Sequence, residues 1–315
     1  MRFTLDKFVS DQAEGLRRLL TRNSSRVVAV CGAPAGGIGG TGNTSTVVNL
    51  AAALAAQGKD VLVIDERQNA LSASRLANVP STGALGAVLG GKRFLQDAVT
   101  RTPFGFSMIA APRDERISHD AAHYRVLLDG PADIVLIDTQ PDRSGALSTL
   151  AAQAHDFVIV TRVAPAAITE AYACIKRLHY AHAISRFRIV VNHVKNAADA
   201  QIAFDNLAGV ASRYLAVQLM PAGCVAEDPR VARAHELSRC AVEAFPTTAA
   251  ARDYRHIAAD LQYWPMPESS HFEWPVQAVH RETPRNIERS INPGATSRRT
   301  ETTSPEFAMR SPAAV

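Results

Sequence analysis

Short apolar runs alternate with longer segments of helical periodicity between Arg26 and Gln262. The runs are almost continuously apolar, which is typical of strands in a parallel sheet covered on both faces. Seven runs are predicted as strands: Val27–Val30, Val61–Ile64, Phe106–Ala110, Ile134–Ile137, Phe157–Val160, Ile189–Val191 and Val217–Met220.

The segments between these runs repeat apolar positions at the spacing of an α-helix. The predicted helices are Thr44–Gln57, Arg93–Thr100, Ala121–Leu128, Ala146–Ala154, Ile168–His179, Asp199–Tyr214 and Thr247–Gln262. This alternation predicts an α/β fold with a doubly wound, mostly parallel sheet. Ligands of such sheets bind beyond the carboxyl ends of the strands, so the residues that follow each strand are the candidates for chemistry.

Three parts are predicted along the chain: residues 1–24, 25–263 and 264–315. In the first part, Ala13, Leu16, Leu19 and Leu20 recur at helical spacing. This N-terminal helix either packs on the domain or offers its face to a partner. The last part holds seven of the 17 prolines and no apolar periodicity. It is predicted as a disordered C-terminal tail.

Charge and hydropathy exclude few functions. The 315 residues carry a formal net charge of +4, which is spread evenly and gives no strong indication of nucleic-acid binding. No apolar run approaches the ~18 residues of a membrane-spanning helix. We therefore expect a cytoplasmic protein that reaches the membrane or the cell pole only through partners.

A glycine-rich turn follows the first predicted strand and leads into the first long helix. Gly37, Gly42 and Thr44 match the phosphate-binding pattern G-x-x-x-x-G-K-[ST], but Asn43 occupies the lysine position. An alternative register, GGIGGT, puts Gly40 at that position; we prefer the first because Thr44 then begins the helix. The predicted nucleotide-binding residues of this turn are Gly39, Gly40, Gly42, Asn43, Thr44 and Ser45. The turn is thus a phosphate site without its cation.

Two apolar strands end in aspartate. Asp65 closes the second predicted strand and Asp138 closes the fourth. Together with the Thr44 hydroxyl, these carboxylates form a candidate Mg²⁺ site. The alternative for Asp138 is an acid that caps a neighbouring loop. Without a cation at position 43, nucleotide affinity should fall and hydrolysis should fall further, because the transition state develops more negative charge.

These motifs resemble those of the MinD/ParA family of deviant-Walker ATPases, and within it the flagellar regulators called FlhG or FleN. The resemblance covers Asp11 to Gln262 and begins with the D-Q-A-x-x-L-R signature. The other matches, in order, are Asn49-Leu50-Ala51 after Thr44, VLVID ending at Asp65, DIVLID ending at Asp138, Ala167–Tyr172, Asn192, and Glu227-Asp228-Pro229.

The resemblance implies a P-loop NTPase fold and weak binding of ATP or ADP with Mg²⁺. It also implies that Asn192 lies at the adenine base. In FlhG proteins the N-terminal signature engages the GTPase FlhF, and a flagellar transcription activator is a second implied partner. The residues that carry this signature here are Asp11, Gln12, Ala13, Leu16 and Arg17.

Departures from the family pattern fall on the catalytic apparatus. Ile38 and Asn43 replace the two P-loop lysines, which argues against the ATP-sandwich homodimer of the family. Arg67 replaces the second acid of D-x-D, and Asp142 replaces the glycine of D-T-x-x-G. Together they predict a pseudo-ATPase rather than an active enzyme.

The leading hypothesis is therefore a site-determining regulator of flagellar number or placement that acts through protein contacts. An alternative is a working nucleotide switch in which Arg67 or Arg143 replaces the lost charge. A ParA-like DNA-binding or pole-positioning factor would need a basic surface, against which the even charge argues. A ligase of the CobQ or dethiobiotin-synthase type also needs the phosphate lysine.

Overall fold

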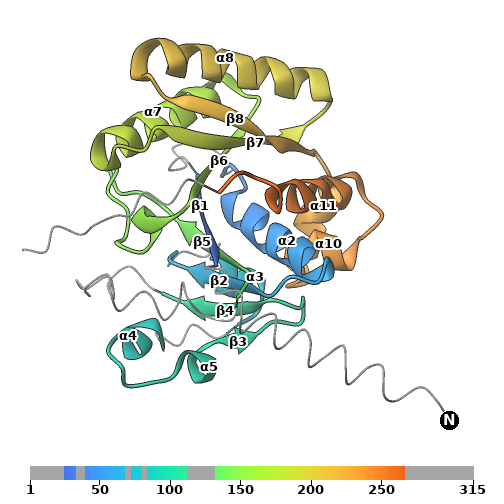
Figure 1. The fold of residues 1–315 in the computed structure, drawn as a ribbon. Helices are drawn as coiled ribbons and strands as arrows, with labels where there is room; N and C mark the ends of the chain where they lie inside the picture. The colour runs from blue at the N-terminus through green and yellow to red at the C-terminus, as the bar shows by residue number, and fades with distance from the viewer. Residues whose placement is uncertain (1–24, 33–39, 68–71, 80–83, 112–131, 267–315) are drawn as a thin grey trace, which may run out of the picture. The chain divides into compact units, whose positions relative to one another are not determined.

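A single eight-stranded sheet organises the computed structural model, which describes residues 25–32, 40–67, 72–79, 84–111 and 132–266 (Figure 1). The strand order is β3-β4-β2-β5-β1-β6-β7-β8. The strands are β1 (Arg26–Gly32), β2 (Val61–Asp65), β3 (Thr100–Arg101), β4 (Ser107–Ala110), β5 (Ile134–Thr139), β6 (Asp156–Arg162), β7 (Arg186–Val194) and β8 (Gln218–Ala226). All neighbouring strands are parallel except β3 and β4, so the predicted fold class is confirmed.

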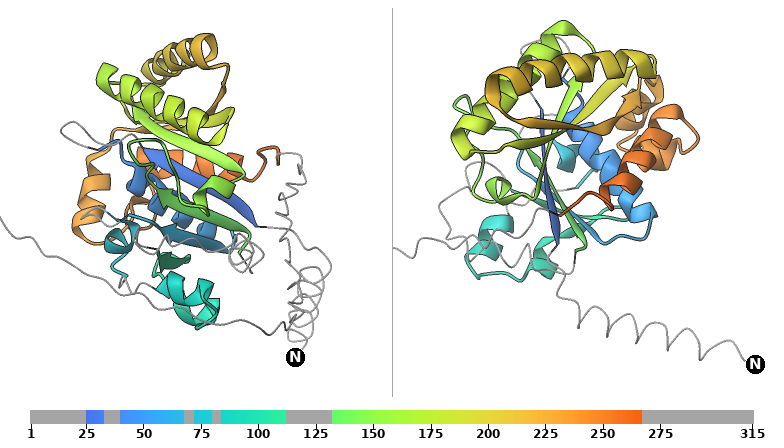
Figure 2. Two further views of the ribbon diagram at one scale, coloured as in Figure 1. Left: turned by 90° about the vertical axis from the view of Figure 1, so that its left-hand side faces the viewer. Right: turned by 45° about the horizontal axis from the view of Figure 1, so that its top comes forward.

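Helices cover both faces of the sheet. They are α2 (Asn43–Ala56), α3 (Ala73–Leu76), α4 (Ala84–Leu89), α5 (Leu95–Ala98), the 3-10 helix η2 (Ala151–Gln153), α7 (Pro165–His182), α8 (Ala197–Leu215), α9 (Pro229–Glu236), α10 (Ala241–Ala244) and α11 (Ala249–Leu261). Figure 1 shows α2, α10 and α11 grouped together, and Figure 2 shows α8 running along β7 and β8.

Alternate residues of the central strand β1 enter different cores. Val28 and Val30 join the core formed with α2 and α11, whereas Ala29 and Cys31 join the core formed with α7 and α8. A strand buried on both faces must be apolar at every position, which explains the unbroken run that marks it in the sequence. Because β1 lies between β5 and β6, the loop after it emerges at the middle of the sheet.

Several element predictions need correction. Residues 146–154 form turns and only the short η2, so the predicted helix Ala146–Ala154 is wrong. Arg93–Thr100 contains only the short α5 and then the first residue of β3. The last strand continues six residues past its predicted end at Met220, to Ala226. The predicted helix Ala121–Leu128 lies outside the described residues.

A buried cluster of charged residues, Arg26, Asp156 and Arg188, lies near the amino ends of β1, β6 and β7. Asp156 accepts hydrogen bonds from Arg26 Nε at 2.9 Å and from Arg188 Nε at 3.1 Å. The Arg26 guanidinium also donates to the carbonyls of Leu261, Trp264 and Pro265. Arg188 stacks on the Trp264 ring at 3.9 Å, so the packed domain extends at least one residue past the predicted boundary at 263.

In the part of the chain that the structure describes, no helix combines the length and apolarity that crossing a membrane requires.

Candidate functional site

The glycine-rich turn leads into α2, whose first residue is Asn43. Gly42 precedes the helix with φ +84°, and a Cβ at this position would lie 2.1 Å from Asn192 Nδ2, so any other residue would strain the backbone and displace the Asn192 side chain. Asn192 Nδ2 donates to the carbonyl of Thr41 at 2.9 Å, and its Oδ1 accepts from the His193 N–H. The residue predicted at the adenine base therefore also supports the backbone of the turn.

Asn43, at the position of the P-loop lysine, points toward the protein interior. Its Nδ2 donates to Asp138 Oδ1 at 2.8 Å and to the carbonyl of Val30 at 3.2 Å, and the residue is 4% exposed. Its Oδ1 is buried and has no hydrogen-bond partner among the described residues. The amide thus joins the P-loop helix to the end of β5.

Asp138 is fully buried at the end of β5. Burial raises the pKa of its carboxyl to about 7, although the nearby Arg67 guanidinium lowers it. Arg67 Nη1 lies 4.0 Å from Asp138 Oδ1. The structure thus places Arg67, which replaces the second acid of the D-x-D pattern, beside Asp138. A positive charge therefore occupies the position at which that pattern has an acid.

The donor set here fits Mg²⁺. Asp138 Oδ2 is buried and accepts no hydrogen bond from the described residues, and the Thr44 hydroxyl lies close enough to stabilise the charged carboxylate. Thr44 and Asp138 would hold the ion or its bound waters, which would neutralise phosphate charge. Among the residues that are described, no group of three or more His, Cys, Asp or Glu side chains is arranged to hold a metal ion.

Asp65, the third predicted metal ligand, uses both carboxylate oxygens in the loop that follows β2. Oδ1 accepts from the Arg67 N–H at 3.0 Å. Oδ2 accepts from the N–H and the hydroxyl of Ser74 at 2.7 and 2.6 Å. These contacts cap the loop, and a metal-binding role for Asp65 stays a prediction.

Glu66 connects the segments that follow β2 and β5. Its carboxylate accepts from the Thr139 hydroxyl at 2.6 Å and from the Ser148 hydroxyl. All three residues are buried. Glu66 was not among the residues predicted from the sequence. These two hydrogen bonds hold the segment after β2 against the segment after β5.

Asp142 forms a tight turn where the family has glycine. Its Oδ1 accepts from the hydroxyl and N–H of Ser144 and from the Ala146 N–H. The hydrogen bond from the Ser144 hydroxyl is the main reason that the pKa of Asp142 is lowered to about 2. The turn is therefore built around a carboxylate whose charged form its hydrogen bonds stabilise.

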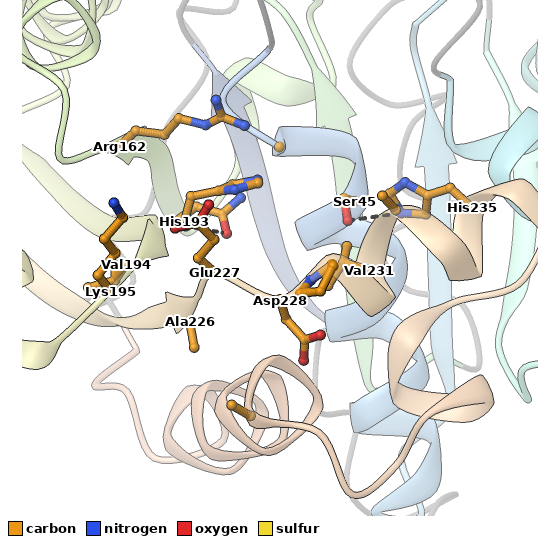
Figure 3. Close-up of a pocket in the computed structure, with 15 residues that line it drawn as sticks. Ser45, Arg162, His193, Val194, Lys195, Ala226, Glu227, Asp228, Val231 and His235 are labelled. Carbon is orange, nitrogen blue, oxygen red and sulfur yellow. Dashed lines mark hydrogen bonds between the residues drawn. The ribbon is translucent and has the colours of Figure 1, made fainter.

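A pocket of about 950 Å³ lies beside the P-loop helix, at the carboxyl ends of β6, β7 and β8 (Figure 3). It is lined by Gly42, Ser45, Arg162, Asn192, His193, Val194, Lys195, Ala226, Glu227, Asp228, Pro229, Val231, Ala232, His235 and Ala249. This is the edge at which doubly wound sheets bind ligands. The volume suits a nucleotide-sized molecule.

Two histidines of this pocket, His193 and His235, are partly buried, and burial lowers the pKa of both. His235 Nε2 lies 3.1 Å from the Ser45 hydroxyl, which joins α9 to the P-loop helix. The pocket wall near α2 is therefore polar at this point.

The structure brings together Gly40, Gly42, Asn43, Thr44, Ser45, Asp138 and Asn192 around the start of α2. Gly39 and the N-terminal signature residues Asp11, Gln12, Ala13, Leu16 and Arg17 lie outside the described residues. Sequence reasoning missed Arg162 and His235. Arg162 closes an apolar strand as Asp65 and Asp138 do, which is the signal that could have identified it.

The chain matches one family over most of its domain. The sequence profile described as CobQ/CobB/MinD/ParA nucleotide binding domain (CbiA) matches residues 33–239. The antiactivator FleN of Pseudomonas aeruginosa is 27% identical over 274 residues, which cover 84% of this chain and 96% of FleN.

Solved structures show the same fold. The MinD cell division protein of Aquifex aeolicus superposes with a TM-score of 0.60 at 18% identity, covering 77% of this chain and 99% of MinD. The septum site-determining protein MinD of Pyrococcus horikoshii, complexed with Mg-ADP, gives a TM-score of 0.56 at 21% identity, over 76% and 96% of the two chains. With its P-loop turn, parallel sheet and strand-end acids, this chain belongs to the CobQ/CobB/MinD/ParA nucleotide-binding domain family.

Proposed function

We propose that this chain regulates flagellar number or placement as FlhG and FleN proteins do, by contacting other proteins, and that its ATP hydrolysis is impaired. The similarity to FleN supports the regulatory part because it spans nearly the whole of both chains. The name of that relative, an antiactivator, makes a transcription activator one partner class. The signature from Asp11 to Arg17 makes an FlhF-like GTPase the other.

One observation carries the catalytic part of the proposal. The side chain at the lysine position, Asn43, is uncharged, buried and bonded to Asp138 and Val30. Phosphoryl transfer depends on positive charge fixed around the transferred group. A neutral amide that is already bonded to the protein cannot supply that charge.

The test measures two activities of the full-length protein. We expect it to stimulate GTP turnover by FlhF, and the Gln12→Ala variant to lose that stimulation while keeping the wild-type melting temperature. A matched exposed substitution on α8, Gln201→Ala, should leave the stimulation unchanged. Stimulation that survives Gln12→Ala would contradict a role for the signature. Brisk Mg²⁺-dependent phosphate release from ATP would contradict impaired hydrolysis.

A second candidate function is an ATP-binding switch, and a specific observation favours it. The pocket of about 950 Å³ is lined in part by Gly42 and Ser45. Asp138 Oδ2 is buried and has no hydrogen-bond partner among the described residues, so it is free to bind a metal ion or accept a hydrogen bond. Arg67 would then supply part of the missing charge. Equilibrium titration with a fluorescent ATP analogue and Mg²⁺ distinguishes the two, because lack of saturation at millimolar ligand excludes the switch.

A further inference from the structure

We propose that Arg162 supplies the phosphate-binding positive charge that Ile38 and Asn43 no longer provide. This inference rests on the nucleotide-binding part of the proposed function and assigns its key residue. The ligand class is a nucleoside diphosphate or triphosphate. Its phosphates would lie between Arg162 and the start of α2.

The register of the sheet brings Arg162 to the glycine-rich turn. β6 pairs with β1 in parallel, and Val160 lies opposite Gly32, the last residue of β1. Arg162 is two residues further along, at the level where the chain leaves β1 for the turn. Figure 3 shows its side chain extending across the pocket toward the P-loop helix.

Arg162 has no ion-pair partner in the part of the chain that the structure describes. Its Nε is buried and makes no hydrogen bond there. A buried guanidinium nitrogen without an acceptor is costly, so the geometry points to an anionic ligand that completes it. Arg67 Nε is likewise buried without a hydrogen-bond partner among the described residues, but the Arg67 guanidinium differs in having a carboxylate, Asp138, 4.0 Å away. The residues 33–39 of the turn contain no carboxylate that could pair with Arg162.

The rest of the pocket suits the other end of a nucleotide. Apolar side chains, Val194, Val231, Ala232 and Ala249, line it and can pack against a planar base. Of its two acids, Asp228 caps α9 by accepting the Arg230 N–H, and Glu227 lies near His193. The phosphate end is therefore assigned to Arg162, whose planar fork of donors matches phosphate oxygens.

The test is an equilibrium titration of the full-length protein with fluorescent ADP, competed by unlabelled ADP and by adenosine. Arg162→Gln should weaken ADP binding roughly tenfold or more, as expected for loss of a charge-assisted hydrogen bond, and leave adenosine binding unchanged. Arg162→Lys should retain most of the ADP affinity. Arg213→Gln is the matched control, because Arg213 is an exposed arginine on α8 that does not line this pocket.

Each result decides the matter. An unchanged ratio of ADP to adenosine affinity in Arg162→Gln overturns the assignment, as does an equal loss in Arg213→Gln. Failure of the wild-type protein to bind ADP at all also overturns it. That failure would leave the FlhF measurement, and with it regulation by contact, untouched. Thermal unfolding without ligand verifies that each variant is folded.

Discussion

Asn43 Nδ2 and Asp138 Oδ1 are joined by a hydrogen bond of 2.8 Å, which links the residue at the lysine position to the acid at the end of β5. The other oxygen of each side chain, Asn43 Oδ1 and Asp138 Oδ2, is buried and lacks a partner among the described residues. Two buried acceptors without partners call for a donor or a cation. We therefore expect substitutions at this pair to affect ATP binding and ATP hydrolysis differently.

Replacing Asn43 by lysine should restore binding more than turnover. An ammonium group at this position can neutralise both Asp138 and a bound phosphate, so we expect the affinity for ATP to rise roughly tenfold. Hydrolysis should stay close to background because Arg67 still replaces the second acid. Titration with a fluorescent ATP analogue and a phosphate-release assay measure the two effects, with Asn43→Gln as the uncharged control. Rapid turnover by Asn43→Lys alone would contradict the prediction.

The buried Asp138 should make stability depend on pH. Its pKa is raised in the folded protein to about 7 from 3.8, so its favourable contribution is present at about pH 4 and is lost as the pH rises through 7. The free energy of unfolding of the wild type, relative to Asp138→Asn, should therefore fall on the order of a few kcal/mol between pH 4 and pH 8. Urea denaturation at both pH values measures it.

The control for this pH effect is Asp205→Asn, which removes an exposed carboxylate from α8. Its stability relative to wild type should change little over the same range. If Asp138→Asn tracks the wild type at both pH values, the Asp138 carboxyl does not titrate as its burial requires.

Gly42→Ala and Gly58→Ala form a matched pair. Both glycines have φ +84°, but a Cβ at Gly42 meets Asn192 Nδ2 at 2.1 Å, whereas a Cβ at Gly58 meets nothing within 4 Å. Gly58→Ala should cost about 1 kcal/mol from backbone strain alone. Gly42→Ala should cost about 2–4 kcal/mol because the displaced Asn192 adds to that strain. Chemical denaturation compares them, and equal losses would show that the Asn192 contact is easily relieved.

Glu66 should stabilise the arrangement of the segments after β2 and β5. Glu66→Ala leaves the buried hydroxyls of Thr139 and Ser148 without their acceptor and should cost about 3 kcal/mol of unfolding free energy. Glu66→Gln keeps an acceptor oxygen and should cost about 1 kcal/mol. Hydrogen exchange of residues 139–148 should speed up in Glu66→Ala. Unchanged exchange there would show that Glu66 does not hold the two segments together.

The core of the fold could be predicted because its strands are buried on both faces. β1, β2, β5 and β6 are almost uninterrupted apolar runs, so the pattern identifies them as strands and gives their positions along the chain. β8 is an edge strand, and the proline within it, Pro221, made the predicted strand too short. The short helices α3 and α10, each of four residues, are too brief for periodicity to reveal.

The wrong helix at Ala146–Ala154 has a local cause. Asp142 binds the backbone of Ser144 and Ala146, and Ser148 gives its hydroxyl to Glu66, 82 residues away in sequence. The segment thus exchanges helical hydrogen bonds for a local turn at Asp142 and a distant contact with Glu66. The strand-end position of Arg162 could be read from the sequence, but its proximity to the turn follows only from the pairing of β6 with β1.

The cluster at Arg26 sets an order of events during synthesis. Arg26 stands on the central strand, yet the Leu261 carbonyl that its guanidinium contacts is encoded 235 residues later. While the chain is emerging from the ribosome, Arg26 can pair with Asp156 but lacks its three carbonyl acceptors until nearly the whole domain has been translated. We therefore expect a polypeptide that ends before Trp264 to be less stable than the complete domain, because the Arg26 guanidinium then keeps only its carboxylate partner.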